Sequence, residues 1–280
     1  MMNEIGIRPS LAAGKYGTLD SLVQKIIKDG YCKFSVDDDI YNLVLKFTDS
    51  VRNCDLEYKF SHASPQHSDG FMGAGSEFSN INGYADICER FCYWYSRREI
   101  NEKNGVTGAL VYKLAAQLEI RMSEIADCLL DGIFSKFDID EKSSGRYYSY
   151  LQACLYYKAG ENNGRAYSQE PHEDGHFLTF ITANSKGLCL HNGKLMEQVN
   201  FADGEFIVMA GSALSILSDH AIKSIYHSVD SQLELDRTSV VYFLNPDLNK
   251  NYSSFYKRKL INFSRHIQEN HISFGNAEIN

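Results

Sequence analysis

The chain has 280 residues, 44% of them hydrophobic and 12% aromatic, which excludes a disordered or fibrous protein and allows a substantial core. Lys and Arg total 28 against 36 Asp and Glu, a net charge of -8 that opposes nucleic acid binding through a broad basic surface. The seven scattered cysteines are typical of reduced thiols. With no apolar run of signal-peptide or membrane-spanning type, the sequence predicts a cytoplasmic protein without a membrane partner.

The first half of the chain has apolar residues at helix-face spacing, interrupted by one short strand-like alternation. The predicted elements are a helix over 19–27, a strand over 31–35, a helix over 40–47, a loop over 62–83 and helices over 85–102 and 107–137. Cys88 and Cys92 are four residues apart on the fifth of these elements. That spacing favours two buried thiols over a metal site completed by His62 or His67.

The second half changes to short β-rich runs separated by turn residues, as in a sandwich or barrel. Strands are predicted over 147–157, 177–182, 187–191, 206–210 and 238–244. We expect one compound domain, with a mainly helical region over 1–145 packed on a β core over 146–250, followed by a helix or tail over 251–280.

A candidate metal site follows from His172, Asp174 and the distant His227. A His and a carboxylate two residues apart on a strand or at its end point the same way, and a second His from another strand can complete three ligands on one face of a metal. Two histidines and one carboxylate suit Fe(II), because they leave the opposite positions open. Taken alone, His-x-Asp also fits a surface His beside a turn carboxylate.

Arg237 and Ser239 add a second feature, ten residues beyond His227. On a strand, a guanidinium and a hydroxyl two residues apart share a face and can together hold a carboxylate. The alternative for Arg237 is a solvated charge at a strand end. Beside a predicted metal site, the pair indicates an anchor for the far end of a dicarboxylic acid.

Residues 151–248 resemble the catalytic core of the isopenicillin N synthase-like family of 2-oxoglutarate/Fe(II)-dependent dioxygenases. The matching motifs, in family order and spacing, are His172-x-Asp174, Leu178-Thr179, Gly187-Leu188, Ser218, Lys223-Ser224, His227-Ser228-Val229 and Arg237-Thr238-Ser239. More loosely, Asp69–Glu77 and Asp86–Phe91 resemble the family's Gly-rich loop and the acidic segment after it. The resemblance implies an α+β protein with a double-stranded β-helix, or jelly-roll, core and flanking N-terminal helices.

Carried over residue by residue, the resemblance implies that His172, Asp174 and His227 bind Fe(II). It further implies that Arg237 and Ser239 bind the distal carboxylate of 2-oxoglutarate and that the hydroxyl of Tyr157 helps to hold this cosubstrate. The sequence departs from the family at Leu155, which replaces an Asn, and at His176, where a small residue is usual.

The implied activity is oxidation by O2 of an unactivated C–H bond in a small molecule, such as an amino acid or a natural-product intermediate. Hydroxylation, desaturation and cyclisation are all compatible with it. The alternative within the family is an Fe(II) oxidase that uses O2 without 2-oxoglutarate. Two histidines also leave local alternatives: His220 competes with His227 as the distal ligand, and His176 either approaches the site or bonds to a neighbouring side chain.

Overall fold

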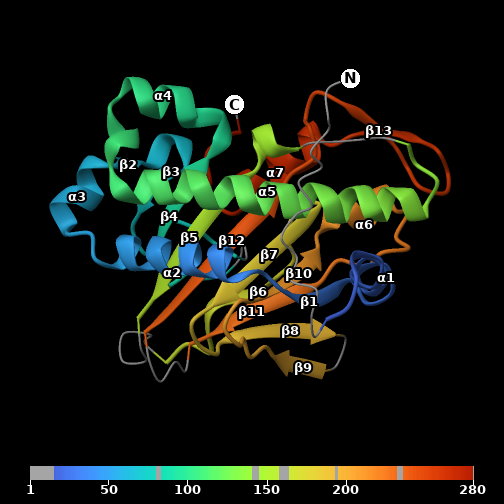
Figure 1. Ribbon diagram of the computed structural model, residues 1–280, viewed down its shortest axis with the longest axis horizontal. Helices are drawn as coiled ribbons and strands as arrows, with labels where there is room; N and C mark the ends of the chain where they lie inside the picture. Colours follow the sequence, from blue (N-terminus) through green and yellow to red (C-terminus); the bar gives the residue numbers. More distant parts are fainter. Residues whose placement is uncertain are drawn as a thin grey trace.

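Twelve of the described strands form two antiparallel sheets, with helices over one face of the larger sheet (Figure 1), and β13 and β14 form a separate two-stranded sheet. The computed structural model describes residues 16–79, 83–140, 145–157, 164–192, 195–231 and 236–279. The eight-stranded sheet has the order β1-β10-β7-β12-β5-β4-β3-β2, and the four-stranded sheet has the order β6-β11-β8-β9. The predicted jelly-roll α+β fold is confirmed.

The strands, with their bounds, are β1 (Tyr31–Ser35), β2 (Ala63–Ser64), β3 (Asp69–Met72), β4 (Glu89–Trp94), β5 (Tyr150–Tyr156), β6 (Tyr167–His172), β7 (Leu178–Ala183), β8 (Leu188–Asn192), β9 (Leu195–Gln198), β10 (Glu205–Ala210), β11 (Tyr226–Asp230), β12 (Arg237–Leu244), β13 (Asn251–Ser253) and β14 (Leu260–Asn262). The helices are α1 (Leu19–Asp29), α2 (Asp38–Arg52), α3 (Leu56–Ser61), α4 (Arg98–Lys103), α5 (Leu110–Lys136), α6 (Ser212–Leu217) and α7 (Ser264–Ser273), with 3-10 turns η1 (Pro65–His67), η2 (Tyr95–Arg97), η3 (Val106–Gly108) and η4 (Arg146–Tyr148). No helix in these described ranges is long and apolar enough to span a membrane.

The early helices and the first strand form where the sequence pattern predicts them, and local caps set their ends. The Thr18 hydroxyl accepts a hydrogen bond from the Ser21 amide at the start of α1, and the Asp37 carboxylate accepts one from the Ile40 amide at the start of α2. Gly30 ends α1 with a φ of 81°, a left-handed conformation that turns the chain directly into β1. α5 confirms the helix predicted over 107–137.

The helix predicted over 85–102 is wrong, because residues 89–94 form β4 and the chain becomes helical only after this strand, in η2 and α4. β4 lies between β3 and β5 in the large sheet. It is buried on both faces, so its sequence lacks the alternation of polar and apolar residues that identifies a strand with one solvent-exposed face. Likewise, the predicted loop over 62–83 includes β2 and β3.

The large sheet separates two hydrophobic cores. One face packs against α1, α2 and α5, and Figure 1 shows α5 as a long helix crossing this face. The other face, with residues such as Cys154, Ile181 and Val241, packs against Leu188 and Val229 of the small sheet. Side chains alternate along each strand, so a residue of β5, β7 or β12 faces either the helices or the small sheet.

Five predicted strands in the second half are confirmed as β5, β7, β8, β10 and β12, while β6, β9 and β11 add strands that the sequence analysis did not define. Beyond residue 250 the chain forms the β13–β14 hairpin and then α7. The division of the chain at residues 145 and 250 stays a prediction, and β1–β4 of the first region belong to the same sheet as the core strands.

Candidate metal centre

The structure brings together the three predicted metal ligands. His172 ends β6 and is the register partner of His227 on β11, and Asp174 follows two residues after β6. The Nε2 atom of His172 lies 3.8 Å from Oδ1 of Asp174, and Nε2 of His227 lies 3.7 Å from Oδ2. Within the described residues this is the one group of three or more His, Cys, Asp or Glu side chains whose donor atoms converge, all within 4.8 Å.

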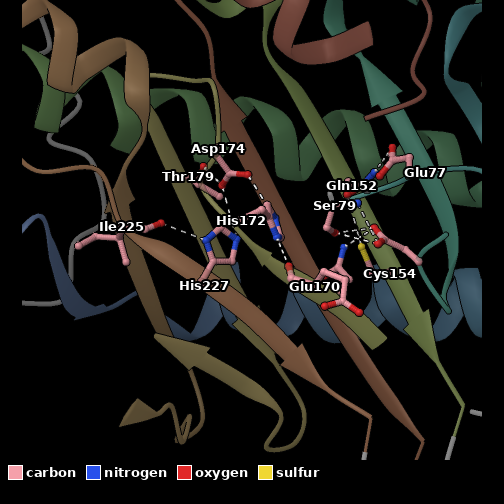
Figure 2. A network of polar contacts seen from close by, with 12 residues as sticks. Glu77, Ser79, Gln152, Cys154, Glu170, His172, Asp174, Thr179, Ile225 and His227 are labelled. Carbon is pink, nitrogen blue, oxygen red and sulfur yellow. Dashed lines mark hydrogen bonds and ion pairs between the residues drawn. The ribbon is translucent and has the colours of Figure 1, made fainter. Parts of the chain in front are cut away.

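Hydrogen bonds fix the orientation of all three side chains (Figure 2). Nδ1 of His172 lies 2.7 Å from the Glu170 carbonyl, and Nδ1 of His227 lies 3.3 Å from the Ile225 carbonyl. A carbonyl only accepts, so each Nδ1 carries the proton and each Nε2 presents its lone pair to the centre of the cluster. The Thr179 hydroxyl donates to Oδ2 of Asp174 over 2.6 Å and holds the carboxylate in place.

Electrostatics favour the protonation states that a metal requires. Burial raises the pKa of the Asp174 carboxyl, but His227, His172, His176 and the Thr179 hydroxyl outweigh burial and hold the pKa below its ordinary value. Burial and the adjacent His172 ring lower the pKa of His227 to about 4. At neutral pH, Asp174 is therefore a carboxylate and His227 a neutral imidazole, the forms that bind metals.

The donor set fits Fe(II). Two imidazole nitrogens and one carboxylate oxygen approach from the same side, where His172 and Asp174 border a pocket of about 370 Å³ between the two sheets. A divalent ion there would have protein donors on one side and open positions on the side of the pocket. A larger cavity, of about 540 Å³, lies between α2 and the helix-covered face of β7 and β12, lined by the side chains of Val44, Thr238 and Val240.

Arg237 and Ser239 line the same pocket as the three predicted ligands, from the face of β12 that points to the small sheet. Arg237 is only 1% exposed, so it is not the solvated strand-end charge of the alternative interpretation. Its Nε and Nη1 atoms have no hydrogen-bond partner among the described residues. A buried guanidinium with free donors is costly unless an anion pairs with it, and a carboxylate matches its planar geometry.

Tyr157, the third predicted cosubstrate residue, does not line the pocket. It follows the last residue of β5 and is 37% exposed, whereas the 2% exposed Tyr156 lines the pocket with Gln152 and Cys154. Side chains alternate along a strand, so a position one residue away faces the opposite side. The tyrosine that lines the pocket is therefore Tyr156, one residue before the predicted Tyr157, and its ring centroid lies 4.9 Å from Cζ of Arg237.

The two histidines that the sequence analysis considered as alternatives, His176 and His220, have separate partners. His176 is 4% exposed, and its Nδ1 lies 2.7 Å from Oδ1 of Asn245, as in the neighbour-bonded alternative. His220 is exposed after α6, with Nδ1 3.3 Å from the Ser215 hydroxyl. Neither belongs to the converging cluster.

The sequence analysis did not identify a buried ionic network that lies beside the pocket. Its residues belong to Asp69–Glu77 and Asp86–Phe91, the two segments that loosely resemble the family. The Arg90 guanidinium, fully buried, lies 2.6 Å from Oδ2 of Asp86 and 2.8 Å from Oε2 of Glu77. Two glutamines that line the pocket bond to the two acids: Nε2 of Gln152 donates to Glu77 over 3.3 Å, and Nε2 of Gln169 donates to Asp86 over 3.2 Å. Figure 2 shows Gln152, Glu77 and Ser79 grouped to one side of the His172 cluster. Burial raises the pKa of Glu77, against the effect of Arg90.

Comparisons with known proteins agree with this geometry. Residues 148–246 match the model of the 2OG-Fe(II) oxygenase superfamily. The jasmonate-induced oxygenase 1 of Arabidopsis thaliana is 27% identical over 159 residues, which cover 53% of this chain and 36% of the relative. The match therefore spans little more than a third of the length of this curated relative.

Solved structures share the fold over nearly the whole chain. A full-length Neurospora crassa protein, crystallised with alpha-KG (2-oxoglutarate), superposes with a TM-score of 0.75 at 16% identity, over 92% of this chain and 91% of that one. The rice dioxygenase for auxin oxidation superposes with a TM-score of 0.73 at 15% identity, over 95% and 94%. At these identities the similarity establishes a common fold only. The substrate of one such protein does not identify the substrate of another.

Proposed function

We propose that this chain, whose residues 148–246 match the model of the 2OG-Fe(II) oxygenase superfamily, is a 2-oxoglutarate- and Fe(II)-dependent dioxygenase that oxidises an unactivated C–H bond of a small molecule. One observation carries the proposal: the converging His172, Asp174 and His227 side chains share a pocket with two buried donors of Arg237, Nε and Nη1, that have no partner in the described part of the chain. A metal site and an anion site in one pocket match a cosubstrate that binds a metal at one end and carries a carboxylate at the other.

When bound, Fe(II), 2-oxoglutarate and O2 supply the oxidising chemistry, with succinate and CO2 as the products of the cosubstrate. In this proposal His172, Asp174 and His227 hold the metal, and the carbonyls of Glu170 and Ile225 keep the two imidazoles in the ligating tautomer. These interactions place the reacting groups before the substrate binds.

The remaining residues of the pocket orient the cosubstrate and exclude water. Arg237 and Ser239 bind the distal carboxylate of 2-oxoglutarate, with the guanidinium already buried against the Tyr156 ring. Apolar side chains of both sheets, including Ile181, Leu188 and Val241, complete the wall. A dry pocket strengthens the ionic contacts to the cosubstrate.

The substrate is proposed to be a small molecule, such as an amino acid or a natural-product intermediate. Support comes from the position of the predicted metal ligands in a pocket between the two sheets and from the Neurospora crassa protein of similar fold, which was also crystallised with alpha-KG and thymine. The proposal includes a cytoplasmic location. The seven free cysteines agree with it, because thiols stay reduced in the cytoplasm.

Turnover of 2-oxoglutarate tests the proposal. The Fe(II)-loaded protein, supplied with 2-oxoglutarate and O2, is expected to form succinate even without substrate, at a slow uncoupled rate, and Asp174→Ala is expected to form none. O2 uptake without succinate would instead establish the oxidase alternative. Iron binding without O2 uptake or succinate, over a panel of amino acids and other small molecules, would contradict both.

A further inference from the structure

We propose that Asp86 and Gln169 act as positioning residues that fix the hydroxyl proton of Tyr156, so that Tyr156 presents only a hydrogen-bond acceptor to the pocket and does not hold the cosubstrate carboxylate. The inference deepens the proposed function and rests on it. It concerns a residue that lies directly opposite Arg237, since Tyr156 and Arg237 are register partners on β5 and β12.

The argument begins at Asp86, which is 2% exposed and surrounded by donors. Its Oδ2 accepts from the Arg90 guanidinium over 2.6 Å, and its Oδ1 accepts from the Ser79 amide and hydroxyl over 3.0 and 2.8 Å. A carboxylate in contact with a buried guanidinium acts as an acceptor. Any amide side chain that bonds to Asp86 must therefore turn its NH2 group toward it.

Gln169 is that amide. Its Nε2 donates to Oδ2 of Asp86 over 3.2 Å, which turns its Oε1 the other way, toward the Tyr156 hydroxyl at 2.6 Å. An amide oxygen has no proton, so the hydroxyl has to donate to it. Burial raises the pKa of the Tyr156 phenol well above its ordinary value, and the phenol keeps its proton at neutral pH.

The consequence for ligands follows from the donor count. A phenol has one O–H, and that of Tyr156 is used by Gln169, so only lone pairs remain for the pocket. A carboxylate also offers lone pairs only, and therefore the carboxylate of 2-oxoglutarate is left to Arg237 and Ser239. A substrate group that contacts the Tyr156 oxygen has to be a donor, an N–H or an O–H.

The test measures the affinity of the anaerobic Fe(II) protein for 2-oxoglutarate, followed by the visible charge-transfer band of the complex. Tyr156→Phe is expected to change the dissociation constant by no more than about twofold, since no bond to the cosubstrate is lost. Gln169→Leu releases the hydroxyl to donate to the carboxylate, and the affinity is expected to increase about threefold to tenfold. The double variant is expected to return to the wild-type value.

Gln152→Leu is the matched control, because Gln152 lines the same pocket but bonds to Glu77 instead of Tyr156. It is expected not to increase the affinity. A merely structural role of Gln169 would weaken binding and would not produce an increase that depends on Tyr156. If Gln169→Leu does not fold, Gln169→Met, which is unbranched and of similar length, replaces it both as the single variant and in the double variant with Tyr156→Phe.

Two results contradict the account in different ways. Weakening of 2-oxoglutarate binding by about tenfold or more in Tyr156→Phe, with no tightening in Gln169→Leu, would make Tyr156 a cosubstrate donor and overturn the inference alone. Absence of any 2-oxoglutarate complex in the iron-loaded wild type would overturn the proposed function and the inference with it.

Discussion

The two ends of the pocket are built in different ways. At the metal end, His172, Asp174 and His227 come from β6, the turn after it and β11, and the two imidazoles bond to backbone carbonyls. At the far end, Arg237 and Tyr156 come from β12 and β5 of the other sheet, and side-chain bonds extend from Tyr156 to the buried Arg90. The metal end thus depends on local backbone, and the far end on side chains from distant segments.

This comparison predicts that damage at the metal end removes iron without unfolding the protein. Asp174→Ala loses one of three donors and is expected to weaken Fe(II) affinity by about 100-fold or more. Iron content and a titration of the metal-free protein measure the loss, with circular dichroism to check the fold. His220→Ala, at an exposed His outside the cluster, serves as the control and is expected to keep its iron. Normal iron retention in Asp174→Ala would remove Asp174 from the site.

Damage at the far end is expected to reduce stability instead. Arg90→Met leaves Glu77 and Asp86 buried without their cation, and the free energy of unfolding is expected to fall by about 3–5 kcal/mol. Urea unfolding of the metal-free protein measures it. Arg265→Met, which removes an exposed ion pair with Glu269, is expected to change stability very little. Equal effects of the two variants would contradict the assignment of Arg90 to a structural network.

A milder change examines the support of a single ligand. Thr179→Val keeps the size of the side chain but removes the hydroxyl that donates to Asp174. Fe(II) affinity is expected to fall about tenfold, as is usual when the outer partner of a ligand is lost. Thr179→Ser keeps the donor and is expected to bind iron nearly as well as the wild type. A loss of the same size in both variants would indicate a packing effect.

The smallest expected effect is the contribution of the metal end to the dependence of stability on pH. Burial and His172 lower the pKa of His227 from 6.5 to about 4, and burial lowers that of His271 to about 4. Between these values the unfolded chain binds protons that the folded chain does not, so the free energy of unfolding of the metal-free protein falls as pH is lowered from 6.5 to 4. Urea unfolding at several pH values is expected to show a smaller slope in His227→Gln than in His220→Gln. Equal slopes would contradict the low pKa of His227.

The metal ligands could be predicted from sequence because the spacing of the His-x-Asp motif is short, although β6 and β11, which carry the two histidines, were not predicted as strands. His172-x-Asp174 fixes two side chains locally, and Arg237, ten positions after His227, begins β12, the strand after β11. The resemblance to a known family supplied the pairing of these distant segments. The prediction of an anion-binding face on β12 needed only the alternation of a strand, which places Arg237 and Ser239 on one side.

The far end was harder to predict for a physical reason. β4 and β5 are buried on both faces, so hydrophobic periodicity does not reveal which residues point to the pocket. That ambiguity underlies the helix wrongly predicted over 85–102. Tyr157, by contrast, was assigned from the family resemblance, and the tyrosine that lines the pocket is its neighbour Tyr156. The bonds of Asp86 to Gln169 and Arg90 depend on the pairing of β4 with β5 and on the position of β6, none of which a single sequence specifies.

The most direct test of the account is an anaerobic titration of the Fe(II)-loaded protein with 2-oxoglutarate, in the wild type and in Arg237→Ala. We expect the wild type to develop the weak visible charge-transfer band of a chelated cosubstrate. Arg237→Ala is expected to need about 30-fold to 100-fold more 2-oxoglutarate for the same band, because a buried carboxylate loses its charge-assisted partner. Iron binding without a band, or equal affinities in the two proteins, would contradict the claim that one pocket holds both the metal and the cosubstrate.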